Sequence, residues 1–311
     1  MIKVSRKKAI IITLCVLAVV AAILVPLVLL PKWAADKVVV IPLSGRITTG
    51  GSSLVSGSAI TPALVRDYLS TVEKDKAVKA IVLRIDSPGG EIGPCQEILL
   101  EIERIKEAKT IVVSMGATAA SGGYYISVAA NKIVALPTTQ TGSIGVISSV
   151  MNVEGLLDKL GIDIEIFKGG KYKDMYRGLR ELTPEEEEIM QDMVDEYYEQ
   201  FIDVVAERRR LTKEEVRNLA TGQLYTGTKA KELGLVDELG DLDTAIEWAL
   251  DLAGLESAVI EYYQSPRLTL WSLIGFLDTI EARISGLSAE DMILLEVLKH
   301  NYPQPLFLYQ S

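Results

Sequence analysis

The chain has 311 residues, of which 49% are hydrophobic and 24% are charged, so it can hold one large α/β domain or two small ones around a substantial core. Its net charge of −10 and its pI near 4.9 argue against a nucleic-acid partner, which would need a basic surface. The mean hydropathy of +0.25 is high for a globular protein, and the excess of apolar residues lies at the N-terminus.

Residues 9–30, AIIITLCVLAVVAAILVPLVLL, contain no charged side chain. As a helix this run is long enough to cross about 30 Å of hydrocarbon, so it predicts a transmembrane anchor. A buried core helix and a cleaved signal peptide are the alternatives. The run is longer than a usual signal-peptide core, and Trp33, Ala34 and Ala35 form no convincing cleavage site, so we expect an uncleaved anchor.

Basic residues are concentrated before this run, with four in residues 1–8 against one, Lys32, in the linker at residues 31–36. The positive-inside rule therefore keeps the N-terminus in the cytoplasm and places the rest of this single-pass chain outside it. Cys15 lies in the predicted span and Cys95 stands alone beyond it, so no disulfide between them is expected.

Strand and helix patterns alternate through the first half of the predicted main domain, residues 37–264. Strands are predicted at residues 37–47, 78–87, 109–116 and 132–136, with helices at 61–75, 91–108 and 121–131. Thr61 and Pro62 are the expected cap and first residue of the first of these helices. The Val- and Ile-rich strands predict a parallel sheet with right-handed crossovers.

A further strand is predicted at residues 163–168, followed by a long helix that Thr183 caps and Pro184 begins. The acidic run from Glu185 to Glu188 suits the positive end of that helix better than a metal site. Shorter helices are predicted at 212–220, 227–234 and 242–254, and a strand at 258–263. Residues 265–311 form an apolar arm that could pack as helices, lie on a membrane or contact another subunit; we expect its end, PLFLYQS, to be peripheral and mobile.

The single histidine, His300, lies in this arm, so a Ser-His-Asp triad and a histidine-based metal site are not expected. A hydrolase built from this chain needs another base, and a neutral lysine is the natural substitute. Lowering a lysine pKa from about 10.4 to near 7 costs about 4 to 5 kcal/mol, so the site has to be dry.

Two glycine turns are suited to stabilising an oxyanion. One is DSPGG, from Asp86 to Gly90, and the other follows Ser121 directly, at Gly122 and Gly123. In each turn, backbone N–H groups at a helix start can point toward developing negative charge. Such turns also occur for steric reasons, and Ser121 taken alone is either a helix cap or a nucleophile.

DSPGG, TAASGGYYIS, TGSIGVI and KYKDM occur in this order, and together they resemble the signal peptide peptidase A family in its short, single-repeat form. The resemblance spans residues 37–263, and AASGGYY with TGS is its specific part. It implies an α/β fold of repeated ββα units, like that of Clp protease and the crotonases, behind an N-terminal transmembrane helix.

The resemblance also implies roles for individual residues. Ser121 matches the nucleophile, and Lys173 matches the general base. Ser143 matches a serine that orients this lysine, while Gly122 and Gly89 are expected to supply the N–H groups of the oxyanion hole.

Neighbouring residues receive other interpretations. Lys168 and Lys171 lie near enough to be rivals for the base, so the choice of Lys173 rests on the motif. Tyr124 and Tyr125 are expected to pack in the core rather than to bind substrate, and Cys95 is expected to be a core thiol.

The function implied is a membrane-anchored Ser-Lys endopeptidase without a metal or other cofactor, degrading remnant signal peptides and other hydrophobic peptides at the membrane. The resemblance further implies a homo-oligomeric ring or dome, and a single-repeat chain would then share each dyad between two subunits. The alternatives are a membrane serine peptidase of the stomatin-partner type, a crotonase-like acyl-CoA enzyme, and a scaffold without activity.

Overall fold

The computed structural model describes residue 15 and residues 17–20, 35–50, 59–263 and 306–308. Within them, the main sheet has the order β10-β7-β6-β4-β1-β11, and each neighbouring pair along this order is parallel, as predicted. The strands are β1 (Lys37–Ser44), β4 (Val78–Ser87), β6 (Thr110–Ala120), β7 (Lys132–Ala135), β10 (Glu238–Leu239) and β11 (Val259–Tyr262).

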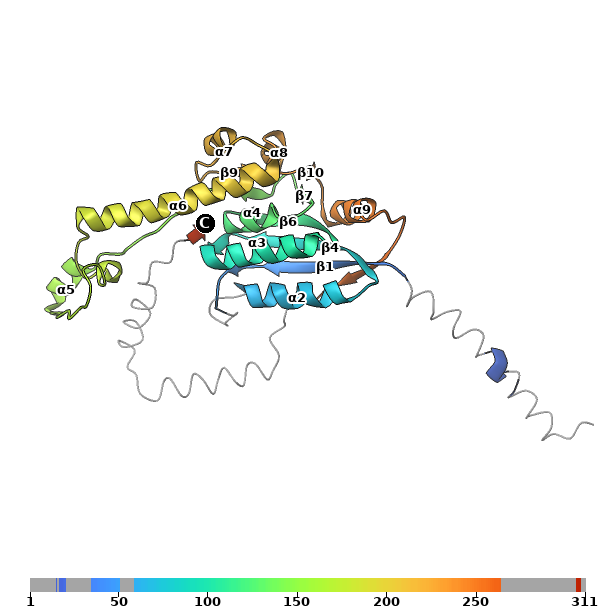
Figure 1. Cartoon of the computed structure of the whole chain (residues 1–311), viewed down its shortest axis with the longest axis horizontal. Coiled ribbons are helices and arrows are strands. Elements are labelled where there is room, and N and C mark those ends of the chain that lie inside the picture. The colour runs from blue at the N-terminus through green and yellow to red at the C-terminus, as the bar shows by residue number, and fades with distance from the viewer. Residues whose placement is uncertain (1–14, 16, 21–34, 51–58, 264–305, 309–311) are drawn as a thin grey trace, which may run out of the picture.

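Helices cover both faces of this sheet (Figure 1). One face packs against α2 (Pro62–Lys74), α3 (Ile92–Lys106) and α4 (Gly122–Ser127), and the other against α9 (Leu242–Leu252). Successive strand residues point to opposite faces, so Val39 and Ile41 of β1 join the first core and Val38 and Val40 join the second. Burial on both faces explains the continuous apolar runs of the strands.

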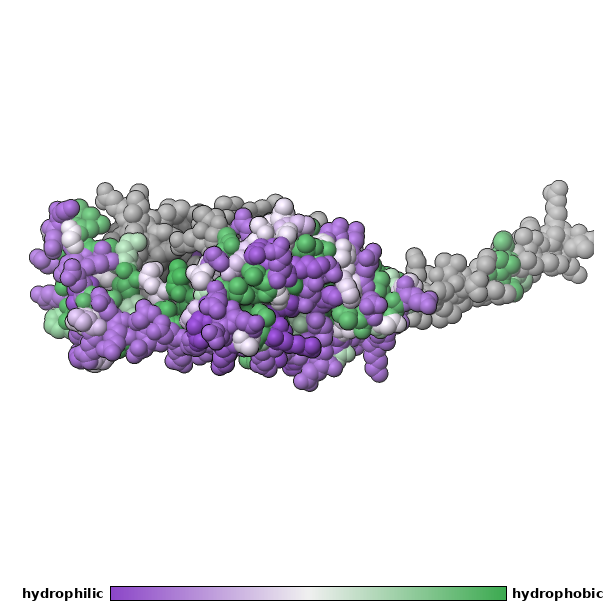
Figure 2. Space-filling model, turned by 90° about the horizontal axis from the view of Figure 1, so that it is seen from above, coloured by the Kyte–Doolittle hydropathy of each residue, from purple (hydrophilic) through white to green (hydrophobic). Residues whose placement is uncertain are grey.

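The predicted cap of α2 is confirmed, since the Thr61 hydroxyl accepts the Leu64 N–H at 3.1 Å. On the face shown in Figure 2, hydrophilic residues dominate, with apolar residues between them.

A second, small sheet lies beside the carboxyl ends of β1 and β4. Its order is β12-β5-β2-β3, formed by β12 (Leu306–Leu308), β5 (Gly89–Glu91), β2 (Arg46–Ile47) and β3 (Ala59–Ile60). β12 pairs antiparallel with β5, so Phe307 lies opposite Gly90. This pairing differs from the expected peripheral tail, because the backbone of β5 offers an open edge that three residues of the tail fill.

Strand β6 extends to Ala120, four residues beyond the predicted end. It leaves the regular ladder with β4 after Met115, which pairs with Ile85, and rejoins it where Ala119 pairs with Ser87. Beyond this irregularity it pairs with β8 (Gln140–Gly142), which in turn pairs with β9 (Leu224–Thr226). The extension carries the chain directly to Ser121.

The long helix α6 (Pro184–Arg209) links the main body to the segment that precedes it, residues 148–183, which is called the arm from here on and is distinct from the C-terminal residues 265–311 (Figure 1). A capping box between Thr183 and Glu186 begins it, as the sequence predicts a cap there. Near its other end, Phe201 and Ile202 are buried in the core. The arm holds α5 (Glu154–Leu160) and a short 3₁₀ helix, η1 (Met175–Arg177); α7 (Lys213–Leu219) and α8 (Gly227–Glu232) follow α6.

The strand predicted at residues 163–168 is wrong, because this segment of the arm has no regular secondary structure. Its alternation of isoleucine with acidic residues is typical of a strand, yet a strand needs a neighbour to complete its hydrogen bonds. Instead Ile162 and Ile164 are exposed, and the Phe167 side chain is 91% exposed.

Most of the predicted anchor, and His300, lie outside the described residues; Cys15 and residues 17–20 of the anchor are helical. Among the residues that the structure describes, no helix combines the length and the apolar character needed to cross a bilayer.

Candidate active site

Ser121 occupies the turn between β6 and α4, with φ of 52° and ψ of −117°. A capping serine has extended backbone angles and accepts a helix N–H through its side chain, and Ser121 does neither. Its Oγ is buried and has no hydrogen-bond partner within the described residues. A strained backbone and a spare hydroxyl at a strand-to-helix turn are typical of a nucleophile.

Asp86 shapes the irregular part of β6 that leads to Ser121. Its Oδ1 accepts the Thr118 N–H at 3.0 Å, and a side chain at Gly116 would place its Cβ 2.8 Å from the Asp86 Cγ. The role of the Asp86 side chain leaves no local pattern in the sequence, because the contact joins strands about 30 residues apart. The carboxylate satisfies an N–H that the regular ladder leaves unpaired.

Ser143 lies beside Ser121 at the end of the neighbouring strand. Ala120 pairs with Gly142 in the ladder, and the Ser121 N–H donates to the Gly142 carbonyl at 2.8 Å. Ser143 also has a positive φ, 48°, and its N–H donates to the Gln223 carbonyl at 2.8 Å. The fold therefore brings together these two predicted site residues.

The two glycine turns also meet. A Cβ on Gly122 would lie 3.2 Å from the Gly89 Cα and 2.5 Å from the Cys95 Sγ, so only glycine fits at this contact. Gly122 begins α4, so its N–H has no acceptor within the helix. The Gly89 N–H, in contrast, donates to the Ser87 Oγ at 3.1 Å.

The residues behind this turn belong to the core, as expected. Cys95, Tyr124 and Tyr125 are buried, and the Tyr124 hydroxyl donates to the Leu235 carbonyl at 2.9 Å. Burial raises the pKa of the Cys95 thiol far above its ordinary value and the pKa of Tyr125 to about 12. Cys95 is therefore an inert thiol rather than a second nucleophile.

The three lysines that could act as base differ in whether their amine already forms an ion pair. Lys168 forms an ion pair with Asp174 at 2.5 Å, and Lys171 forms one with Glu185. Lys173 is exposed, and its amine has no ion-pair partner in the part of the chain that the structure describes. Of the three, Lys173 therefore has the amine that remains available.

Lys173 and Ser121 do not meet within one chain. Asp174, the next residue, is linked through Arg180 to Glu186 in the first turn of α6, whereas Phe201 on the same helix stacks edge-on against Tyr125, four residues after Ser121. At 1.5 Å per residue, about 22 Å of helix separates Glu186 from Phe201. The arm with α5 extends away from the body that contains α4 (Figure 1).

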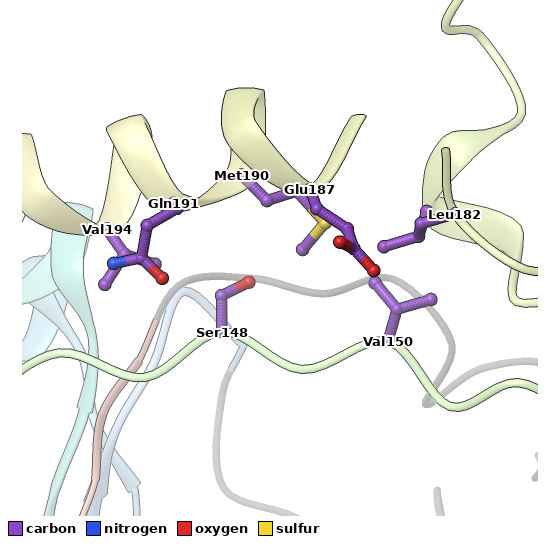
Figure 3. Close-up of a pocket in the computed structure, with 7 residues that line it drawn as sticks. All are labelled: Ser148, Val150, Leu182, Glu187, Met190, Gln191 and Val194. Carbon is purple, nitrogen blue, oxygen red and sulfur yellow. The ribbon is translucent and has the colours of Figure 1, made fainter. Parts of the chain in front are cut away.

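A groove of about 210 Å³ lies in the arm, between α6 and the extended chain at residues 148–150 (Figure 3). Its lining is mostly apolar: Ser148, Val150, Leu182, Glu187, Met190, Gln191 and Val194. None of these residues belongs to the turns around Ser121, so this groove is not the catalytic cleft.

The edge of β5 provides a peptide site beside Ser121. Here β12 lies next to α4 and pairs with Gly89, Gly90 and Glu91 as an antiparallel strand. Ser121 is 1% exposed in this arrangement. A peptide backbone in this position lies next to both glycine turns.

Comparison with known proteins identifies the family. The model of Peptidase family S49 matches residues 103–256, and that of Clp protease matches residues 55–149. The protein named "Putative protease slr0021" of Synechocystis sp. is 38% identical over 88% of this chain and 96% of its own length. The chain belongs to peptidase family S49.

This S49 peptidase is also 35% identical to "Putative signal peptide peptidase SppA" of Enterococcus faecium, over 88% of this chain and 81% of the relative. A ClpP1 mutant from Listeria monocytogenes aligns with 67% of this chain and 94% of its own, at 18% identity and a TM-score of 0.43. Family membership makes the protein a serine peptidase, and its own elements form a mixed α/β fold. The family favours peptide hydrolysis over the acyl-CoA chemistry considered above.

Proposed function

We propose that this peptidase cuts peptides with a Ser-Lys dyad made of Ser121 and Lys173. The Ser121 Oγ attacks the peptide carbonyl while the neutral amine of Lys173 takes its proton and then passes it to the leaving amine. Water hydrolyses the acyl-enzyme in the same way. The observation that carries this proposal is the buried Ser121 Oγ, which has no partner among the described residues and is held on a strained backbone.

The oxyanion of each tetrahedral intermediate accepts hydrogen bonds from the backbone. The Gly122 N–H, at the start of α4, is one donor. The Gly89 N–H is the second, once the rotatable Ser87 hydroxyl releases it. Contact between the two glycine turns supports this pairing.

Substrates bind as an added strand on β5. The antiparallel pairing of β12 with Gly89–Glu91 supports this mode, since main-chain hydrogen bonds accept many sequences. We propose remnant signal peptides and other hydrophobic peptides as the substrates. An anchor at residues 9–30, with the N-terminus in the cytoplasm and the peptidase domain outside it, would concentrate the enzyme where such peptides lie.

Two copies of the chain complete each site. Lys173 is exposed, and about 22 Å of helix separates Glu186, on the lysine's side of α6, from Phe201, on the serine's side, so a neighbouring copy has to deliver the lysine. Contact with that copy also removes the amine from water, which favours the neutral form that a base requires. In this proposal Ser143 accepts a hydrogen bond from the incoming lysine, and its position beside Ser121 supports that role. Such head-to-tail contacts close into a ring or dome.

The test is hydrolysis of a fluorogenic apolar peptide by the full chain in detergent, from pH 6 to 10. Ser121→Ala and Lys173→Ala should each abolish activity, whereas Lys171→Ala should not. An equal mixture of the two inactive variants, coassembled, should regain about a quarter of the wild-type activity, because a quarter of randomly formed interfaces hold both native residues. Full activity of Lys173→Ala would refute the dyad, and an inactive mixture that has coassembled would refute the shared site.

A further inference from the structure

Arg180 lies between two carboxylates at the base of the arm. Its Nε and Nη2 each donate to Asp174 at 3.1 Å, and its Nη1 and Nη2 donate to Glu186 at 2.8 and 2.7 Å. Both contacts are bidentate, which fixes direction as well as distance. One guanidinium therefore joins the turn that contains Lys173 to the first turn of α6.

Both carboxylates are shielded from water. The Asp174 side chain is 6% exposed and that of Glu186 is 3% exposed. Glu186 is further held by the Thr183 N–H at 2.9 Å, as part of the capping box, and Asp174 also receives Lys168. Buried carboxylates with this many donors have one preferred arrangement, since each alternative leaves a charge unpaired.

The remaining contacts around Lys173 are weaker. Its N–H donates to the Gly170 carbonyl at 3.4 Å, and Lys171 and Tyr172 reach only the exposed Glu185. Surface ion pairs of this kind contribute little to stability. Lys168 binds Asp174 from within the same loop, so among the described residues the Arg180 contact is the buried ion pair that joins this turn to α6.

We propose that Arg180 is a positioning residue for the general base: by clamping Asp174 onto Glu186, it fixes the backbone beside Lys173 to the start of α6. This inference rests on the proposed role of Lys173. A lysine at position 180 keeps the charge but cannot make both forked contacts. The clamp thus acts through geometry, not through charge alone.

The experiment compares Arg180→Lys and Arg180→Met in the assembled full chain. Arg177→Met is the matched control, because Arg177 is an exposed arginine on the neighbouring η1 turn. We expect both Arg180 variants to lower kcat at least tenfold, to leave KM within twofold and to shift the rising limb of the pH profile, which reports the pKa of the base. Arg177→Met should behave as the wild type. Wild-type kcat and pH profile in Arg180→Lys would overturn the inference.

Two further measurements distinguish a failure of the positioning role from a failure of the proposed dyad and from loss of assembly. Lys173→Ala is run in parallel: if it is active, the proposed dyad fails, whereas an inactive Lys173→Ala with a normal Arg180→Lys refutes only the clamp. If Arg180→Met disassembles, the uncharged variant Asp174→Asn, Arg180→Met, Glu186→Gln removes the buried charges. This variant should assemble, and its kcat should remain at least tenfold below that of the wild type. A wild-type kcat in this variant would refute positioning by Arg180.

Discussion

Ser121 and Ser143 end two adjacent parallel strands at matching positions, and each has a positive φ, 52° and 48°. The carboxyl ends of neighbouring parallel strands meet at one edge, so the two serines face the same site although 22 positions separate them in the chain. Both side chains are almost fully buried. This pairing supports the division of roles proposed for them, with Ser121 as nucleophile and Ser143 as partner of the lysine.

Ser143→Ala tests that division. Loss of the hydrogen bond to the ammonium that forms when Lys173 takes the serine proton should lower kcat about ten- to a hundredfold. Because the lysine loses an orienting acceptor, the rising limb of the pH profile, which reports the pKa of the base, should also move. Kinetics across pH 6 to 10 check this, with circular dichroism as the control for folding. Unchanged kinetics in Ser143→Ala would leave this serine a turn former only.

The backbone strain at Ser121 predicts an unusual stability ranking. Glycine adopts the Ser121 backbone angles, φ of 52° and ψ of −117°, with little strain, whereas serine and alanine are strained there. Strain of this kind costs about 1 to 3 kcal/mol, so after the extra chain entropy of glycine we expect Ser121→Gly to be about 1 kcal/mol more stable than Ser121→Ala. Both should be inactive. Denaturant unfolding measures the difference, and a more stable alanine variant would contradict the strain.

Gly122→Ala should damage the site through a specific collision. The new Cβ would lie 2.5 Å from the Cys95 Sγ, and overpacking of this kind costs about 1 to 3 kcal/mol. Cys95→Ala removes the sulfur, so the double variant should recover part of the loss, with a coupling of about 0.5 to 3 kcal/mol. A double-mutant cycle measures it. Simple additivity would show that Cys95 is not the obstacle.

The Asp86 contact predicts a difference between two substitutions. Asp86→Ala leaves the Thr118 N–H without its acceptor, at a cost of about 1 to 3 kcal/mol, and should displace the end of β6 and lower kcat. Asp86→Asn retains an acceptor oxygen and should stay close to the wild type. Unfolding and peptide hydrolysis are measured together. Equal losses in both variants would point to the charge instead of the hydrogen bond.

The ion pairs of Arg180 with Asp174 and Glu186 also predict how the stability of this region depends on pH. Hydrogen bonds from Arg180, then from the Thr183 N–H, lower the pKa of Glu186 to about 2, and Arg180 and Lys168 lower that of Asp174. Carboxyl pKa values lowered by folding stabilise the protein fully above their unfolded values, near pH 4, and this stabilisation is lost as pH falls toward 2. The protection factors for hydrogen exchange at residues 168–186 should therefore stay high at pH 5 and fall progressively between about pH 4 and 2.

Glu186→Gln is the control for that pH dependence. It cannot ionise, so part of the pH dependence of protection should disappear while Asp174 retains the rest. Protection in the wild type that stayed constant from pH 5 to 2 would contradict the buried ion pairs.

Local sequence patterns are enough to predict most of the fold. The apolar strands β1, β4, β6 and β7, the Thr61 and Thr183 caps and the long helix α6 all follow from residues close in sequence. Parallel pairing also follows, because strands alternate with helices. The strand predicted at residues 163–168 is wrong because it depends on more than local pattern. The residues there alternate as in a strand, but a strand needs a neighbouring strand to pair with.

The family, the alternating α/β architecture and the two glycine turns can all be predicted from sequence, because each depends on short motifs whose residues act locally. Four findings required the three-dimensional structure: Ser121 is not a helix cap, Asp86 supports the end of β6, and Arg180 joins Asp174 to Glu186. The fourth is that Lys173 lies away from the serine in its own chain. These facts depend on contacts between distant segments, and such contacts leave no periodicity in the sequence.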